Sequence, residues 1–97
     1  MSVSDADIAF ATDLFSDLGQ VTSRKMFGGL GLYLDAAIFA LVSSEGRIYV
    51  KATSETAAML ADEGAEQFHN MPYWSLPESA LDDPETACDW ARRFLTS

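Results

Sequence analysis

The sequence is poor in cysteine, histidine and positive charge, and each shortage excludes a class of protein. Cys88 is the single cysteine among 97 residues, so internal disulfides do not hold this chain together. His69 is the single histidine, and with one cysteine it falls short of an ordinary four-ligand zinc site. Nothing resembles a secretory signal, and no apolar run approaches the roughly 20 residues of a membrane span. We therefore expect a cytoplasmic protein without a metal or other cofactor.

Positive charge is the scarcest property of the chain. Six Lys and Arg residues stand against 15 Asp and Glu residues, for a formal net charge of −9. Affinity for nucleic acid comes mostly from cations that meet phosphates, so this charge opposes DNA binding. Most of the cations lie between residues 24 and 51, which leaves the middle of the chain mildly basic and both ends acidic.

Capping residues and hydrophobic periodicity predict a mixed α+β domain. Ser4 begins a helix-capping pattern, and apolar residues at helical spacing follow it, which predicts a helix over Asp5–Leu18. Asp83 and Pro84 are typical of the first positions of another long helix. The other predicted elements are strands over 23–27, 30–34, 37–42 and 47–51, a helix over 54–63 and an extended segment over 67–74. We expect one two-layer domain over 1–97, in which an antiparallel sheet of about four or five strands packs against helices.

Hairpin loops decide which side chains share a face of this sheet. If Asp35-Ala36 and Glu45-Gly46 are two-residue loops, the helix-facing side contains Leu30, Leu32, Leu34, Phe39, Leu41, Ile48 and Val50. The opposite side then contains Gly31, Tyr33, Ile38, Ala40, Val42 and Tyr49. A solvated face should alternate with polar residues, and this one does not. We therefore expect it to be covered by a second copy of the chain, by another protein or by the chain's own residues 71–77.

The basic residues are the candidate contacts for a partner or a nucleic acid. Arg24 and Lys25 are neighbours, so on a strand they point to opposite faces, and the one nearer the helices should need a carboxylate partner. Arg47 and Lys51 share a face with Tyr49 between them, an arrangement that can stack a nucleic-acid base.

The glycine-rich stretch SRKMFGGLGLYLD, residues 23–35, does not match a phosphate-binding loop. Lys25 precedes the glycines instead of following them, and a strand rather than a helix comes next. We interpret Gly28 and Gly29 as a bend in a strand, and an anion held by their amides is the alternative. No nucleophile elbow accompanies His69, so the sequence predicts no catalytic residue and no enzyme.

Four stretches taken together resemble the N-terminal domain of the TfoX family, bacterial proteins linked to natural competence. They are VTSRKMFGGLGLYLD (21–35), FALVSSEGRIYVK (39–51), MPYWSLPESALDDPE (71–85) and WARRFL (90–95). The most specific motif residues are Met26, Phe27, Gly28, Gly29, Met71, Pro72, Tyr73 and Trp74. The resemblance implies a small α+β domain similar to type III secretion chaperones, which commonly dimerise. Full competence regulators carry a helical C-terminal domain as well, which we expect to be absent from this chain, since it ends at Ser97.

These observations leave two functions open. The first is a non-enzymatic regulatory or protein-interaction module, which the resemblance and the apolar second face of the sheet favour. The alternative is a DNA-binding transcriptional regulator that uses a local basic patch, formed by Arg24, Lys25, Arg47 and Lys51.

Overall fold

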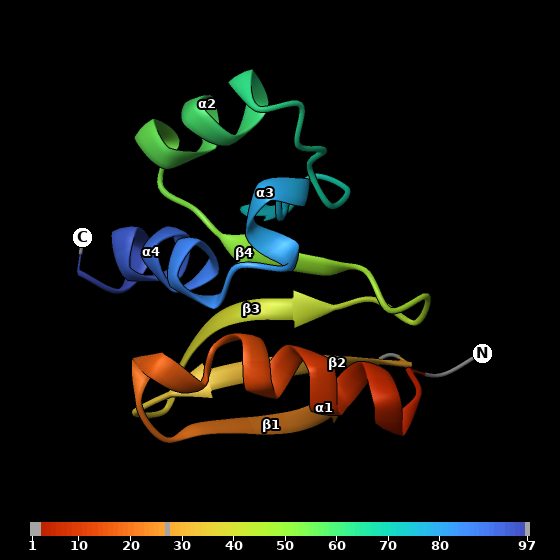
Figure 1. Ribbon diagram of the computed structural model, residues 1–97. Coiled ribbons are helices and arrows are strands. Elements are labelled where there is room, and N and C mark those ends of the chain that lie inside the picture. Colours follow the sequence, from red (N-terminus) through yellow and green to blue (C-terminus); the bar gives the residue numbers. More distant parts are fainter. Residues whose placement is uncertain (1–2, 27, 97) are drawn as a thin grey trace.

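The computed structural model describes residues 3–26 and 28–96 (Figure 1), so Phe27 of the family motif lies outside the described residues. In chain order the elements are α1 (Asp5–Leu14), the 3₁₀ helix η1 (Ser16–Leu18), β1 (Val21–Met26), β2 (Gly29–Leu34), β3 (Ala37–Val42), β4 (Ile48–Lys51), α2 (Ser54–Asp62), β5 (Tyr73–Ser75), α3 (Glu78–Leu81) and α4 (Pro84–Leu95). The strands form one antiparallel sheet in the order β1-β2-β3-β4-β5. The predicted α+β class is confirmed.

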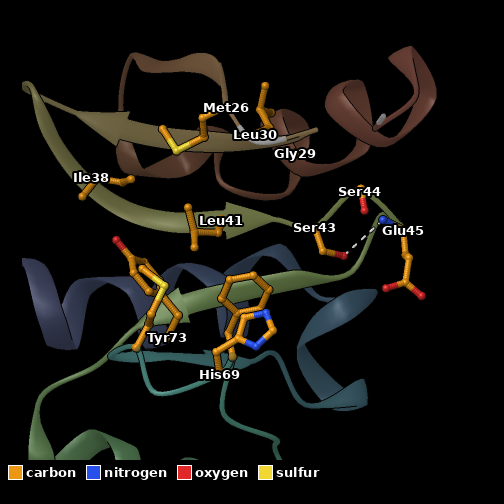
Figure 2. A pocket seen from close by; sticks show the side chains of 12 residues that line it. Met26, Gly29, Leu30, Ile38, Leu41, Ser43, Ser44, Glu45, His69 and Tyr73 are labelled. Atoms are coloured by element: carbon orange, nitrogen blue, oxygen red, sulfur yellow. Dashed lines mark hydrogen bonds between the residues drawn. The ribbon is translucent and has the colours of Figure 1, made fainter. Parts of the chain in front are cut away.

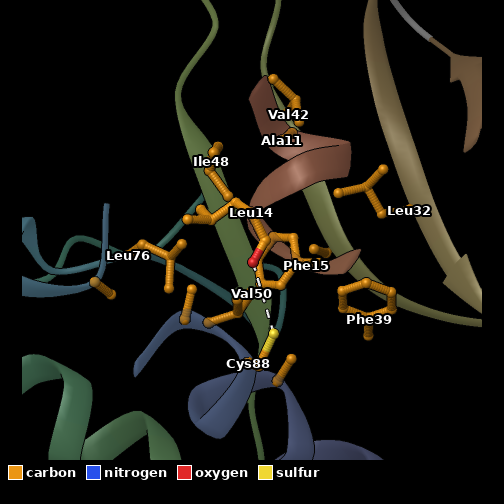
Figure 3. Close-up of a cluster of buried hydrophobic side chains, with 14 of the residues drawn as sticks. Ala11, Leu14, Phe15, Leu32, Phe39, Val42, Ile48, Val50, Leu76 and Cys88 are labelled. Carbon is orange, nitrogen blue, oxygen red and sulfur yellow. Dashed lines mark hydrogen bonds between the residues drawn. The ribbon is translucent and has the colours of Figure 1, made fainter. Parts of the chain in front are cut away.

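The hydrophobic core lies between one face of the sheet and the helices α1 and α4 (Figure 3). Ala87 and Ala91 of α4 are fully buried, and such small side chains let the helix approach the sheet closely. The largest enclosed side chains of the core include Phe15, Leu30, Leu32, Phe39, Leu60, Val42, Val50 and Cys88. The core therefore draws on strands from the middle of the sheet and on helices from both ends of the chain.

The first helix is shorter than predicted. Its capping box forms, because the Ser4 side chain accepts a hydrogen bond from the Asp7 N–H at 3.1 Å. The helix nevertheless ends at Leu14, where the Ser16 hydroxyl donates to the Asp13 carbonyl at 2.9 Å and competes with the helical pattern. Phe15 turns into the core instead, and residues 16–18 continue as η1.

The loop between β2 and β3 has the predicted length. Asp35 and Ala36 connect the two strands with positive φ values of 52° and 69°, as a two-residue primed turn requires. Leu34 pairs with Ala37 directly beside the loop, as predicted. The first hairpin is therefore closed by a turn that holds an alanine in a left-handed conformation.

A β-bulge in β3 makes the rest of the predicted register wrong. Leu32 pairs with Ala40 rather than with Phe39, because Phe39 is the extra residue of the bulge. Ala40 and Val42 consequently belong to the core, with 0% and 1% of their surface exposed, and not to the second face of the sheet. Leu41, which was predicted to face the helices, lies on the second face instead.

The loop between β3 and β4 is also longer than predicted. The Ser43 N–H donates to the Arg47 carbonyl at 2.8 Å, so the loop consists of residues 44–46 rather than of Glu45 and Gly46 alone. Gly46 has a φ of 86°, which is typical of a three-residue loop that ends in a glycine bulge. Val42 therefore pairs with Ile48, and the core positions of β4 remain as predicted.

The predicted extended segment over 67–74 forms a small hairpin. The Phe68 N–H donates to the Tyr73 carbonyl at 2.8 Å, and Gln67 pairs with Trp74. Between them the Met71 N–H donates to the Phe68 carbonyl at 3.1 Å and closes a tight turn. The second half of this hairpin is β5, so residues 66–68 cover its outer edge.

The alanine in the primed turn leads to a prediction about stability. A left-handed conformation costs a residue with a Cβ about 1 kcal/mol, and glycine escapes most of that cost. We expect Ala36→Gly to raise the free energy of unfolding by about 0.5–1 kcal/mol, measured by urea denaturation. The matched control is Ala37→Gly in the adjacent strand, which should lower stability. Destabilisation by Ala36→Gly would contradict this account of the turn.

Candidate interaction site on the open face of the sheet

The face of the sheet opposite α1 and α4, called the open face below, contains a cavity of about 600 Å³ (Figure 2). Its apolar lining consists of Met26, Leu30, Ile38, Leu41, Phe68, Met71 and Tyr73. The β3–β4 loop closes one end with Ser43, Ser44 and Glu45, and His69 stands at the rim. This size and this mixture of many apolar groups with a few polar ones are typical of binding sites.

The floor of the cavity depends on two local features of the strands. Ile38 and Leu41 would point to opposite faces of a regular strand, and they share the open face because the bulge at Phe39 lies between them. Gly31 leaves room above β2, since a Cβ there would lie 2.7 Å from the terminal methyl of Met26 and 3.2 Å from Ile38. The missing side chain therefore lets Met26 and Ile38 lie across the sheet.

The hairpin of residues 66–75 supplies the wall of the cavity. His69 has a φ of 54°, and its ring meets the ring of Phe68 at 4.5 Å between centroids. Phe68 in turn packs on Tyr49 at 4.8 Å. Met71 remains 43% exposed at the rim, so part of the apolar lining is accessible to a partner.

Gly28 directly precedes β2 and Gly29 is its first residue, and both shape the backbone. Gly28 has a φ of 78°, which confirms the predicted bend. A Cβ at Gly29 would collide with the carbonyl oxygen of Val42, so this position tolerates no side chain. The bend thus brings β2 against the end of β3.

The predicted face for a dimer or cover is only partly correct. Tyr33 and Ile38 lie on the open face with part of their surface exposed. Tyr49 lies on the same face but is 8% exposed, because Phe68 covers it. The bulge and the longer loop move Ala40 and Val42 to the other face, as described above. Leu41, Phe68 and Met26 take their places, and only Met26 stood out in the sequence, as part of the family motif.

The predicted basic and aromatic trio does not form a surface for stacking bases. Arg47 makes an ion pair with Glu66 at 2.8 Å, and this hydrogen bond is the main reason why the pKa of Arg47 is raised. Tyr49 is buried beneath Phe68, so its ring is not available to a base. Lys51 lies over the ring of Phe94 at 4.9 Å. Each member of the trio is therefore engaged within the chain.

Arg24 and Lys25 are arranged differently. Arg24 pairs with Gly31 and faces the open side, whereas Lys25 pairs with Leu30 and faces the side of the helices, so the predicted opposite orientation is confirmed. Both side chains are exposed. No ion pair within the described residues involves either of them, and the predicted carboxylate partner is therefore wrong. β1 is an edge strand, where Lys25 reaches water without being buried.

Chemistry at the remaining candidate residues is limited. Among residues 3–26 and 28–96, no cluster of three His, Cys, Asp or Glu side chains is suited to hold a metal ion. Cys88 is buried and donates to the Leu14 carbonyl at 3.6 Å, and burial raises the pKa of its thiol. In the same part of the chain, no helix has the length and apolar character needed to cross a membrane.

These features define a class of protein: a two-layer α+β domain with a five-stranded antiparallel sheet, closed by helices on one face and hollowed on the other. The chain belongs to the TfoX N-terminal domain family, whose model matches residues 13–96. A curated relative, the DNA transformation protein TfoX1 of Aliivibrio fischeri, is 41% identical to it over 54 residues. That match covers 56% of this chain and 25% of the relative, so the chain corresponds to a small part of that protein.

Tyr73 at the cavity provides a prediction about pH. Burial raises the pKa of its phenol above the usual value, and the neighbouring Tyr33 adds to the effect. A raised pKa in the folded state means that the folded protein holds the proton more tightly than the unfolded chain. The resulting stability is complete below about pH 10 and is lost as the pH rises through the folded-state value. We expect the free energy of unfolding to fall more steeply above about pH 10 in the wild type than in Tyr73→Phe. Equal slopes in chemical denaturation would contradict this.

Proposed function

We propose that this domain is a non-enzymatic regulatory module that acts through protein contacts at its open face, where a second copy of the chain binds. The apolar cavity carries this proposal. It presents Leu41 within a rim of flexible methionine side chains, Met26 and Met71. Methionine adapts to the shape of a partner surface and is frequent at such contacts. Protein contacts account for an apolar cavity of this kind better than solvent does.

The distribution of charge supports pairing through this face. All acidic residues except Asp35, Glu45 and Glu66 lie in the helices or in the residues that cap them. On the open face, Glu66 is paired with Arg47, Arg24 adds a positive charge, and Glu45 at one end of the cavity is the remaining acidic group there. A molecule with a net charge of −9 repels its own copies, and the open face is where that repulsion is weakest.

The family gives the proposed module its cellular context. The relative from Aliivibrio fischeri is named a DNA transformation protein. We extend this role to the present chain and propose that it regulates competence in the cytoplasm, through a protein that acts on transcription. The whole relative is much longer than the matched part, so this step rests on the shared domain alone.

Direct DNA binding is the second candidate function, and the observations do not favour it. Arg47 is paired with Glu66 and Lys51 lies over Phe94. Tyr49, whose ring was predicted to stack on a base, is buried beneath Phe68. Only Arg24 and Lys25 remain to bind phosphates, and two cations would have to overcome the repulsion between DNA and a domain of net charge −9.

Sedimentation equilibrium tests the dimer. We expect the wild type to dimerise and Met71→Glu to raise the dissociation constant at least about tenfold, because the interface would bury an unpaired carboxylate. Met59→Glu is the matched control. Met59 is 37% exposed on α2, and its sulfur accepts a hydrogen bond from Arg93 at 3.9 Å, so a carboxylate is tolerated there. A wild type that stays monomeric, or equal dissociation of both variants, would overturn the proposal.

Direct DNA binding is tested by retention of duplex DNA at low ionic strength. We expect the domain to show no affinity that falls steeply with salt, and the double variant Arg47→Ala, Lys51→Ala to behave like the wild type. Binding that both substitutions weaken would favour the DNA-binding alternative instead.

A further inference from the structure

The two edges of the sheet differ. At one end of the sheet, residues 66–68 cover β5: the Ser75 N–H donates to the Glu66 carbonyl at 2.9 Å, and Phe68 bonds to Tyr73. At the other end lies β1, which pairs with β2 alone (Figure 1). Apart from this pairing with β2, no backbone hydrogen bond between described residues involves residues 22–26. Within the described residues, β1 is thus the free edge, and its outward N–H and C=O groups are available to another strand.

Charge distinguishes this edge from the rest of the molecule. Arg47 and Arg92 have carboxylate partners, and Lys51 and Arg93 lie over aromatic rings. Arg24 and Lys25 have neither among the described residues, and both are exposed in the middle of β1. The acidic groups lie mostly in the helical layer. The unpaired positive charge of an acidic protein therefore gathers on its free strand edge.

We propose that β1 binds an extended acidic segment of a partner protein, which joins the sheet as a further strand. Main-chain hydrogen bonds to β1 would supply affinity, and carboxylates opposite Arg24 and Lys25 would supply specificity. A polar hollow of about 480 Å³ lies beside β1 on the open side, and it is lined by Thr22, Ser23, Arg24, Tyr33 and Ala36. This hollow receives side chains of the added strand.

The orientation of the two cations specifies the sequence of this strand. Arg24 faces the open side and Lys25 the side of the helices. Residues directly opposite each other in paired strands share a face, so the carboxylates that meet them must also point to opposite faces. Two acidic residues next to each other satisfy this requirement, in either strand direction. Two acidic residues separated by one position point to the same face and satisfy only one cation.

A second copy of β1 is a poor occupant of the same edge. In an antiparallel pair of two β1 strands, the registers that pair most of the strand bring a cation opposite or diagonal to another cation. Like charges at these positions destabilise the pairing, and lysine on an edge strand commonly prevents self-association in this way. The surface thus differs from the open face, for which we propose a second copy as the partner.

Synthetic peptides that bind the intact protein test the proposal. Their binding is measured by fluorescence anisotropy at low and moderate salt. The probe is a short peptide rich in Thr and Val with two adjacent Glu residues at its centre. The first control has the same composition with the Glu residues separated by one position. The second control is N-methylated at alternate backbone positions, which removes strand hydrogen bonds and keeps the charge. We expect the adjacent-Glu peptide to bind, the separated one to bind about two- to fivefold more weakly, and the N-methylated one not to bind.

Variants of the protein complete the test. Arg24→Gln and Lys25→Gln should each weaken binding about two- to fivefold. The double variant Arg92→Gln, Arg93→Gln alters the other adjacent basic pair of the chain, on α4, and should leave binding unchanged. Binding should also survive in Met71→Glu, so that failure of the dimer and failure of the edge site are distinguishable.

Three results would overturn the proposal. No binding of the adjacent-Glu peptide would mean that Arg24 and Lys25 only guard the edge against self-association. Equal binding of the N-methylated peptide would indicate charge attraction without an added strand. Tighter binding of single-stranded DNA than of the peptide, lost in Arg24→Gln and Lys25→Gln, would assign the edge to nucleic acid.

Discussion

The arrangement of both faces of the sheet depends on one extra residue, Phe39, in β3. The bulge places Phe39 and Ala40 together in the core, where the ring of Phe39 meets that of Phe15 edge-on at 5.2 Å. The same bulge allows Ile38 and Leu41 to share the open face, although they are three positions apart. Packing inside the core and the cavity on the opposite face are thus two consequences of a single irregularity.

Charge is segregated between the two layers of the domain. The acidic residues are concentrated in the helices and at their caps, where Asp7 and Asp83 accept hydrogen bonds from free N–H groups. The strands contain Arg24, Lys25 and Lys51 and no acidic residue, and Arg47 directly precedes β4. Such an arrangement keeps the helical layer well solvated and leaves the sheet side as the part of the surface where an approaching protein meets the least repulsion. The open face and the free edge lie on this same side, yet they suit partners of different chemistry.

The family relationship and the geometry address different questions. The match to the TfoX N-terminal domain family covers residues 13–96, and therefore the whole sheet and α4 but only the end of α1. The motif residues that the structure describes have mainly structural roles. Gly28 and Gly29 bend the chain into β2, and Met71 and Tyr73 line the cavity. None of these roles requires a reactive group. These motif residues therefore shape the backbone before β2 and the apolar cavity on the open face.

The sequence by itself determined the class of fold, the helix caps and the order of the elements. These features rest on local chemistry: Ser4 and Asp83 cap their helices, and glycine or aspartate permits a turn, whatever lies beyond. Tertiary structure alone decided which residues share a face. A bulge at Phe39 and a loop that is longer by one residue change the register. Neither was predicted from the local sequence. The same limit applies to the site, because the cover that Phe68 places over Tyr49 joins segments far apart in the chain.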